Sequence, residues 1–224
     1  MSIPDGSSPD VPTIVIPYRN RQDHLRCALA RFKHMPVIVV EQQDDLPFNR
    51  GSLLNAGYVK AREDGAHRVI LHDVDLIPDD TLLRMYAEEW PLPVVHFGAR
   101  FTRYNNTRSY FGGVHGFCGG HFPGYPNAYF GWGGEDDALR RRVKSSDVTY
   151  PRHGCYLDLE GFVTARDKLS ALSPADKCPN KWELARSDNA ARDNHRVCSL
   201  EKSVRWERTR DNVIWGYITH RRGA

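Results

Sequence analysis

The stretch Val69-Ile70-Leu71-His72-Asp73-Val74-Asp75-Leu76-Ile77-Pro78 decides how the rest of the chain is interpreted. Its apolar first half is typical of a buried strand, and two aspartates one residue apart follow it. Open α/β sheets bind ligands outside the carboxyl ends of their strands. Residues i and i+2 of an extended segment point the same way, so we expect both carboxylates to face one site. Two such carboxylates repel each other unless a cation lies between them, which favours a divalent metal that also contacts phosphate.

The alternative for these aspartates is a role at a helix N-terminus, because residues 81–90 have a helical pattern. Asp79 and Asp80 already stand where that helix needs its cap. Asp73 and Asp75 are therefore available for another role.

The composition indicates an ordinary globular protein. The chain has 224 residues, of which 40% are hydrophobic, and this length suits a single domain. The net charge of +3 fits an anionic small molecule, and the dispersed Lys and Arg residues give no reason to expect nucleic acid.

Cysteine usage and the N-terminus bear on the compartment. Five cysteines without a CxxC spacing predict free thiols in a reducing compartment rather than disulfides or structural zinc. Residues 1–10 are polar and rich in Pro and Ser, so we expect no signal peptide. No apolar run approaches the roughly 20 residues of a membrane span. We therefore expect a cytoplasmic protein without a transmembrane segment.

Strands and helices alternate in the first 100 residues. Strands are expected at residues 13–16, 36–40, 69–72 and 92–97, and helices at residues 25–32, 52–62 and 81–90. This pattern predicts an α/β fold with a largely parallel sheet and helices on both faces. Arg19 and Arg21 lie in the turn after the first strand, where a helix N-terminus favours an anion. Two solvated arginines are the alternative.

Two middle segments, residues 110–116 and 124–134, combine aromatic residues with glycine. Glycine lets the backbone approach a ligand closely, and aromatic faces suit sugar rings, although simple core packing is the alternative. Glu135-Asp136-Asp137 then opens a helix at residues 138–143. The three acids complement the helix dipole, or one of them serves as a general base beside Trp132.

Beyond residue 151 the pattern weakens. Residues 155–160 alternate as a strand does, which places Asp158 and Glu160 on one face. Residues 165–211 are charged and poorly periodic, so they are predicted to form a mobile lid with weak helices at 182–194. A last strand is expected at residues 213–219.

Five motifs, in this order, resemble the β-1,4-galactosyltransferase family of inverting enzymes with the GT-A fold. The resemblance covers residues 12–165. The motifs are Pro17-Tyr18-Arg19-Asn20-Arg21, Phe48-Asn49-Arg50-Gly51, Asp73-Val74-Asp75, Tyr110-Phe111-Gly112-Gly113-Val114 and Gly131-Trp132-Gly133-Gly134-Glu135-Asp136-Asp137.

The resemblance implies a single GT-A catalytic domain over residues 1–224, with a nucleotide-sugar-binding half at 11–100 and an acceptor-binding half with a lid at 101–224. It places the uridine and phosphates of a UDP-sugar against the first motif, at Pro17, Tyr18, Arg19 and Arg21. Asp75 would bind Mn²⁺, with Mg²⁺ as the alternative, and Asp73 would bind the donor sugar or ribose.

The resemblance also implies roles for residues of the other motifs. Asp136 would be the catalytic base, with Glu135 and Asp137 orienting the acceptor. Trp132 would stack on the sugars, and Tyr110 stands where the family favours galactose over N-acetylgalactosamine. Gly113 and Gly134 complete the substrate-binding set.

The chain departs from the family at the remaining metal ligands and at the N-terminus. The family has a histidine-containing pattern where this chain has Asp158-Leu159-Glu160. We expect the two carboxylates to replace imidazoles in an all-oxygen site that suits Mn²⁺ or Mg²⁺, with His153 and His220 as rival ligands. A chain without the anchor and stem of animal members resembles a bacterial or viral relative.

The resulting prediction is inverting, metal-dependent transfer of galactose from UDP-galactose to a hydroxyl of an oligosaccharide, polysaccharide or glycolipid, with a β-linkage. One base on the acceptor hydroxyl and neutralisation of the leaving UDP suffice for this reaction. Three alternatives stay open: a UDP-GalNAc transferase of the same mechanism, a non-catalytic sugar- or nucleotide-binding protein on this scaffold, and a nucleotidyltransferase on a similar sheet.

Overall fold

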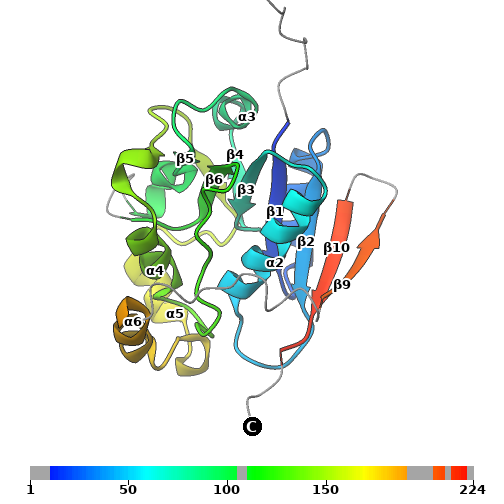
Figure 1. The fold of residues 1–224 in the computed structure, drawn as a ribbon. Coiled ribbons are helices and arrows are strands. Elements are labelled where there is room, and N and C mark those ends of the chain that lie inside the picture. Colours follow the sequence, from blue (N-terminus) through cyan, green and yellow to red (C-terminus); the bar gives the residue numbers. More distant parts are fainter. Residues whose placement is uncertain (1–10, 105–109, 191–203, 210–212, 221–224) are drawn as a thin grey trace, which may run out of the picture.

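A computed structural model describes residues 11–104, 110–190, 204–209 and 213–220. Its main sheet contains β1 (Thr13–Tyr18), β2 (Val37–Gln42), β3 (Arg68–His72), β5 (Val94–Val95), β6 (Val114–Cys118), β7 (Val148–Thr149), β9 (Val204–Arg208) and β10 (Val213–Ile218). The eight strands lie in the order β7-β5-β6-β3-β1-β2-β10-β9 (Figure 1). The central strands β3, β1, β2 and β10 are parallel, whereas β6 and β9 run antiparallel to β3 and β10. The predicted α/β fold with a mostly parallel central sheet is thus confirmed.

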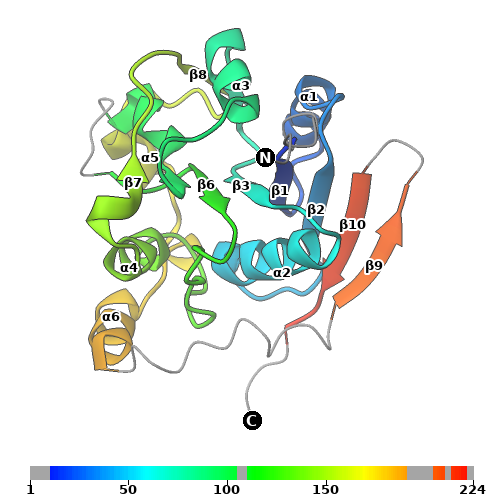
Figure 2. The same ribbon diagram turned by 45° about the horizontal axis from the view of Figure 1, so that its top comes forward.

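Helices cover both faces of the sheet. They are α1 (Gln22–Arg31), α2 (Arg50–Glu63), α3 (Asp80–Ala87), α4 (Glu135–Arg142), α5 (Ala165–Ala171) and α6 (Lys181–Ala190). Helices α1 and α3 share one hydrophobic core with the sheet, and α2 and α4 share the other. Figure 2 shows α1 and α2 on opposite sides of β1 and β2. Within the described ranges, no helix combines the length and the apolar character that crossing a bilayer requires.

The alternation along β1 explains the two cores. Ile14 and Ile16 point to the α1 face, and Val15 points to the α2 face. Helix α2 approaches the sheet closely, because a Cβ atom at Gly57 would lie only 2.3 Å from Cγ1 of Val15. The side chain of Asn49 caps α2 by accepting a hydrogen bond from the Ser52 amide.

Three elements differ from the sequence-based prediction. The strand expected at residues 92–97 is reduced to β5, because Pro91 and Pro93 cannot donate to a ladder and a 3₁₀ turn (Phe97–Arg100) follows. Part of the glycine-rich segment 110–116 belongs to strand β6, where Gly116 leaves room for the Trp90 ring. Part of the expected lid is helix α5 and strand β9, whereas α6 corresponds to the helix expected at residues 182–194.

A second, two-stranded sheet joins distant parts of the chain. It pairs β4 (Leu76–Pro78) with β8 (Tyr156–Asp158) in antiparallel fashion. The Leu159 amide donates to the carbonyl oxygen of Asp75 over 2.9 Å. This pairing therefore brings residues 158–160 beside the Asp73-Val74-Asp75 turn.

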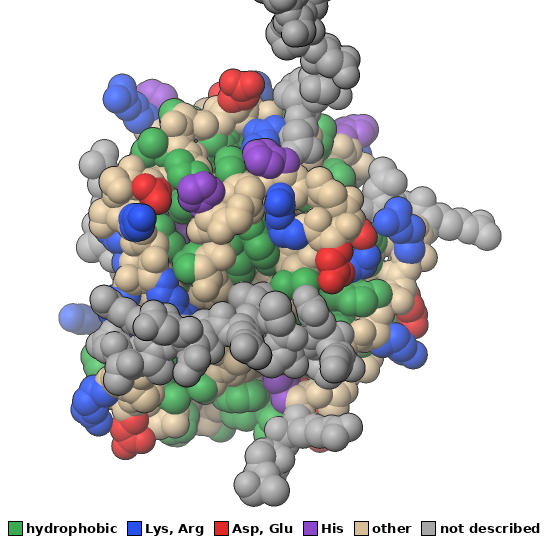
Figure 3. Space-filling view, in the orientation of Figure 1, with side chains coloured by type: hydrophobic (Ala, Val, Ile, Leu, Met, Phe, Trp, Pro, Cys, Tyr) green, Lys and Arg blue, Asp and Glu red, His purple; other side chains and the backbone are tan. Residues whose placement is uncertain are grey.

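Charged side chains are mixed on the face that Figure 3 shows. Lys and Arg are interspersed there with Asp, Glu and hydrophobic side chains. Acids and bases that lie far apart in the sequence concentrate instead around one cavity.

Candidate active site

A cavity of about 1240 Å³ lies where strands β1 and β3 end. Residues from both halves of the chain line it. Among the predicted site residues, the lining contains Pro17, Arg19, Arg21, Asp73, Asp75, Tyr110, Trp132, Gly134, Glu135, Asp136, Asp137 and Glu160. The structure thus brings most of the predicted site residues to one place, and both aspartates of the Asp73-Val74-Asp75 turn face it.

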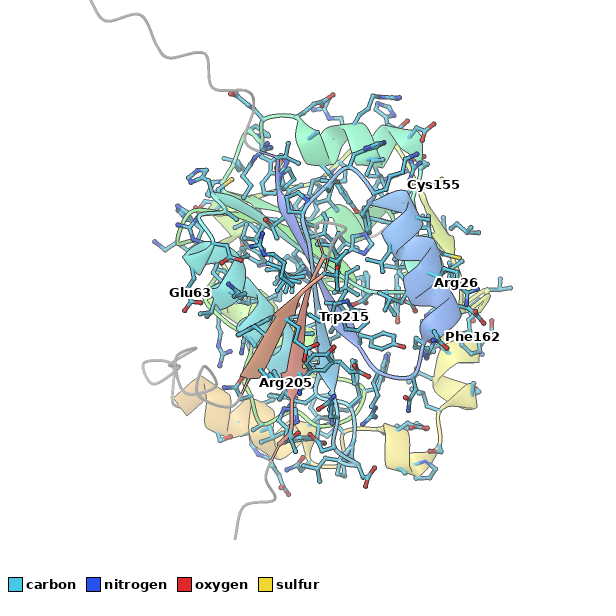
Figure 4. The ribbon with its side chains drawn as sticks, turned by 90° about the vertical axis from the view of Figure 1, so that its right-hand side faces the viewer. Arg26, Glu63, Cys155, Phe162, Arg205 and Trp215 are labelled. Carbon is cyan, nitrogen blue, oxygen red and sulfur yellow. The ribbon has the colours of Figure 1, made fainter. Side chains whose placement is uncertain are left out.

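Three predicted residues lie outside the cavity lining. The Tyr18 ring is buried and contacts Trp215 of β10 edge-on, with 6.0 Å between the ring centroids. Figure 4 shows Trp215 on its strand. Gly113 contributes its carbonyl oxygen, which accepts from Nη2 of Arg50 over 3.1 Å. Asp158 binds Arg103.

Arg50 holds the acids of the cavity together, and sequence reasoning gave it no role of its own. It is the first residue of α2, and its side chain is only 12% exposed. Its Nε donates to Oδ1 of Asp73 over 2.6 Å, and its Nη1 donates to Oδ1 of Asp136 over 2.8 Å. The same Nη1 bonds the Tyr125 hydroxyl at 3.2 Å. One guanidinium therefore links the turn after β3 to the first turn of α4.

The acids around Arg50 resist ionisation. Burial raises the pKa of Asp136 well above its usual range; Arg50 opposes this rise, and Glu135 and Asp73 reinforce it. Burial also raises the pKa of Glu135, whose Oε2 has no hydrogen-bond partner among the described residues. Its Oε1 lies 3.9 Å from Nη1 of Arg50. These carboxylates are suited to accept a proton or to bind a hydroxyl group.

Backbone conformation explains why α4 places its acids at the cavity. Gly134 precedes the helix with φ of 98°, a left-handed conformation that favours glycine. A Cβ atom there would lie 2.7 Å from the Tyr129 ring. The helix consequently begins at Glu135, and its first turn faces the site.

Asp75, Asp158 and Glu160 form an acidic triad across the cavity. One ligand oxygen from each lies within 4.8 Å of the others, which is the predicted set of metal ligands. Burial raises the pKa of Asp75 to about 7, and the nearby Asp73 and Glu160 add to the rise. The three-carboxylate donor set fits a hard divalent cation such as Mn²⁺ or Mg²⁺.

Neither histidine rival joins the triad. His220 binds Asp44 through Nδ1 at 2.8 Å and Ser52 through Nε2 at 2.7 Å, which fixes the end of β10 against the start of α2. His153 is exposed. The structure therefore favours the carboxylates over these rivals, because His220 has both ring nitrogens engaged elsewhere and His153 lies outside the triad.

The aromatic residues of the cavity are held by their neighbours. The Tyr110 ring stacks on Tyr104 with 3.8 Å between centroids and 4° between planes. The Trp132 amide donates to the carbonyl oxygen of Asp176 over 2.7 Å, which ties the glycine-rich loop to the segment after α5. Phe162, which Figure 4 shows near α1, also lines the cavity.

A mostly parallel sheet with an Asp-x-Asp turn after β3, and a second acidic motif beside it, defines the GT-A class of glycosyltransferases. The family model for the N-terminal region of glycosyl transferase group 7 matches residues 4–87. The model described as the N-terminal domain of galactosyltransferase matches residues 93–168. The two matches lie side by side and together take in most of the chain, which therefore belongs to the glycosyl transferase group 7 family.

Named relatives agree with this assignment. A β-N-acetyl-D-glucosaminide β-1,4-N-acetylglucosaminyl-transferase of Lymnaea stagnalis is 40% identical over 171 residues, which are 68% of this chain and 34% of the relative. β-1,4-galactosyltransferase 4 of Homo sapiens is 38% identical over 144 residues, which are 58% of this chain and 42% of the relative. The match thus spans less than half the length of these relatives.

Solved structures share the fold. A variant of Drosophila β1,4-galactosyltransferase 7 in complex with manganese, UDP-Gal and xylobiose superposes with a TM-score of 0.66 at 24% identity, covering 92% of each chain. The same protein in complex with xylobiose gives a TM-score of 0.63.

Proposed function

We propose that this chain is an inverting glycosyltransferase that moves galactose from UDP-galactose to a hydroxyl of a glycan, with a β-linkage. The observation that carries the proposal is that two acidic sets meet at one cavity, with Asp158 as the one member outside its lining. Asp75, Asp158 and Glu160 suit a cation, and Glu135 and Asp136 suit an acceptor hydroxyl. The names of the galactosyltransferase relatives support the same activity.

The donor half of the site is assigned to residues 11–100. The guanidinium groups of Arg19 and Arg21 lie at the cavity wall after β1, where they would face the phosphates of UDP. Asp73 would bind the sugar or ribose, and Trp132 would cover the donor. The acidic triad would hold Mn²⁺, with Mg²⁺ as the alternative. A bound divalent ion would neutralise charge on the leaving UDP.

Asp136 would act as the base. Arg50 and Tyr125 both bond its Oδ1, so we assign the acceptor proton to Oδ2. As the acceptor oxygen bonds to C1 of the sugar, its proton passes to Asp136, and the bond from C1 to UDP breaks on the opposite face. Glu135 and Asp137 would orient the acceptor.

The acceptor half is assigned to residues 101–224, with the segment from Phe162 to Lys181 as a lid that lines the cavity. We propose an oligosaccharide, polysaccharide or glycolipid as acceptor; the xylobiose bound to the Drosophila protein supports a saccharide. A cytoplasmic location is part of the proposal and is supported by the thiols of Cys27, Cys155 and Cys178.

A second donor is also proposed for testing. The Lymnaea relative is named as an N-acetylglucosaminyl-transferase and is 40% identical to this chain. UDP-GlcNAc therefore joins UDP-GalNAc as a rival of UDP-galactose. Tyr110, at the cavity wall, is the residue that we expect to disfavour a bulky group on the sugar C2.

Calorimetric titration of UDP-galactose, UDP-GalNAc, UDP-GlcNAc, UDP-glucose and UDP, with Mn²⁺ and then with EDTA, tests the donor. Proton NMR of the product from the preferred donor and a saccharide panel tests transfer and anomeric configuration. We expect metal-dependent binding and a β-linked product, both lost in Asp75→Ala. Binding without transfer to any acceptor would favour the non-catalytic sugar- or nucleotide-binding protein.

A further inference from the structure

Arg103 lies between two of the three triad carboxylates. Its side chain is only 4% exposed. Nε donates to Oδ2 of Asp158 over 2.9 Å, Nη2 donates to the same oxygen, and Nη1 donates to Oε2 of Glu160 over 2.9 Å. The guanidinium also packs on the rings of Phe101 and Phe162. It is therefore fixed in place as a bridge between the two carboxylates.

The oxygens of Asp158 and Glu160 are already engaged. Oδ1 of Asp158 accepts from the Glu160 amide over 3.0 Å. Oε1 of Glu160 accepts from Arg21 over 2.9 Å and also from Lys168. Each oxygen of these two carboxylates thus accepts a hydrogen bond. A divalent cation that takes a carboxylate oxygen as ligand must compete with these donors, and most directly with Arg103, which bonds both side chains.

Once Asp75 is ionised, the charges around the triad balance without a metal. Asp75, Asp158 and Glu160 contribute three negative charges, and the ion-pair partners Arg21, Arg103 and Lys168 contribute three positive charges. An added divalent cation would make this cluster positive and is attracted only weakly. A diphosphate carries the negative charge that restores the balance.

We propose that Arg103 is an internal counter-ion that competes with the divalent cation for Asp158 and Glu160, so that the metal binds the protein tightly only together with a nucleoside diphosphate. The inference rests on the proposed function, because the diphosphate is the leaving group of that reaction. Arg103 thereby determines how tightly the protein binds the metal.

Titration of Mn²⁺ into the metal-free protein, followed by calorimetry and by the EPR signal of free Mn²⁺, tests the proposal. We expect Arg103→Met to bind Mn²⁺ about tenfold more tightly than the unaltered protein, because a positive charge and a competing donor are both removed. Lys168→Met is the matched control: it removes the same charge, but of the three triad carboxylates Lys168 bonds Glu160 and not Asp158, so its gain is expected to be smaller. Added UDP is expected to raise Mn²⁺ affinity strongly in the unaltered protein and less in Arg103→Met.

Weaker or unchanged Mn²⁺ binding in Arg103→Met overturns the proposal and makes Arg103 a support for the ligands. Equal gains in the two methionine variants also overturn it, because charge alone then explains the effect. Circular dichroism and thermal melting establish folding. If Arg103→Met does not fold, Arg103→Lys, whose single ammonium cannot match the fork that joins both carboxylates, must show the gain instead. The UDP-sugar titrations of the unaltered protein report separately on the proposed function.

Discussion

Single arginines that bond several partners hold the motifs around this cavity together. Arg50 binds Asp73 and Asp136 at the same time, although 23 and 86 residues separate it from them in the sequence. Removing one partner of a buried ion pair leaves the other charges uncompensated, which typically costs about 3–5 kcal/mol. The contribution of Arg50 to the free energy of unfolding can therefore be measured separately from any contribution to catalysis.

We expect Arg50→Met to lower the free energy of unfolding by roughly 3 kcal/mol, because two acids lose their common partner. Urea unfolding followed by circular dichroism measures this loss. The control is Arg26→Met on α1, where the arginine is 75% exposed and pairs with the exposed Asp23. The control should change stability little. An equally small change in Arg50→Met would show that the surrounding acids tolerate its absence.

We expect Asp136→Asn to bind UDP as the unaltered protein does and to lose transfer by about 10²–10⁴-fold, the usual contribution of a general base. Asparagine has the same shape, and Arg50 keeps its bond to Asp73. Calorimetry gives the UDP affinity, and product formation gives the rate. Because burial raises the pKa of Asp136, transfer by the unaltered protein should increase with pH as this carboxyl ionises. Full transfer by the variant would remove Asp136 as the base.

The acidic residues of the site could be predicted, and the arginines that join them could not. Asp73 with Asp75, and Asp158 with Glu160, are pairs at i and i+2 in extended segments, so local spacing indicates a shared face. Arg103 and Arg50 are single basic residues whose partners lie far away in the sequence. For Arg50 the signal was its place in the Phe48-Asn49-Arg50-Gly51 motif, next to a helix cap, but nothing local indicated its distant partners.

At the scale of secondary-structure elements, strand β6 contributes one member of a buried histidine pair that affects the stability of the protein at low pH. The rings of His115 on β6 and His96 after β5 stack with 4.8 Å between centroids. Burial lowers the pKa of His96 to about 4, and the charge of Arg140 adds to this fall. Burial also lowers the pKa of His115 well below its usual value, and the charge of Arg50 adds to that fall. Both nitrogens of His115 have no hydrogen-bond partner among the described residues.

The folded protein should lose stability as the pH falls below 6.5. Below that value the unfolded chain binds protons on these histidines, whereas folded His96 stays neutral down to about pH 4. His96 alone accounts for roughly 3 kcal/mol over this range, at about 1.4 kcal/mol per pKa unit. His115→Phe should weaken this dependence, because a phenyl ring suits the neighbouring Phe111 and Phe117 and binds no proton. Urea unfolding between pH 7 and 4 measures the slope.

The exposed His34 supplies the control for this experiment. His34→Asn should retain the slope of the unaltered protein. An unchanged slope in His115→Phe would mean that His115 does not determine the acid response.

Long apolar elements could be predicted from sequence, and short or glycine-containing ones could not. Strand β1 is continuously β-branched up to Pro17, and its helical neighbour α1 repeats apolar residues at the right spacing. Strand β6 contains Gly116, which lowers its apparent strand propensity. The rings of Trp90 and Phe97, which pack where a side chain would lie, explain that glycine. Strand β9 lies at the edge of the sheet, where Val204 and Trp206 are only partly buried and alternate with charged residues, so its pattern is too short to stand out in a charged segment.

Across the whole molecule, one sheet unites the segments that build the cavity. Figure 1 shows α4, α5 and α6 at one end of the sheet and β9 and β10 at the other. The cavity is lined by the turn after β1, by the turn after β3, and by residues from Phe162 to Lys181. A ligand in this cavity contacts segments from both halves and should stabilise the fold as a unit.

We expect Mn²⁺ alone to raise the melting temperature little and UDP with Mn²⁺ to raise it clearly. A ligand at 100 times its dissociation constant stabilises the folded state by about 2.7 kcal/mol. Because Asp158 and Glu160 are already paired with Arg103, the ion by itself gains little from them. Scanning calorimetry with Mn²⁺, UDP, both ligands, and both ligands with EDTA separates these contributions.

The shift in melting temperature depends on contacts from both halves of the chain. Single substitutions can therefore separate the contribution of the metal from that of UDP. Asp75→Ala should abolish the additional stabilisation by Mn²⁺ while the basic turn with Arg19 and Arg21 still binds UDP weakly. A large shift with Mn²⁺ alone, retained in Asp75→Ala, would place the ion elsewhere in the molecule. A shift with UDP that does not respond to EDTA would show instead that Arg21, Arg103 and Lys168 neutralise the diphosphate without a metal.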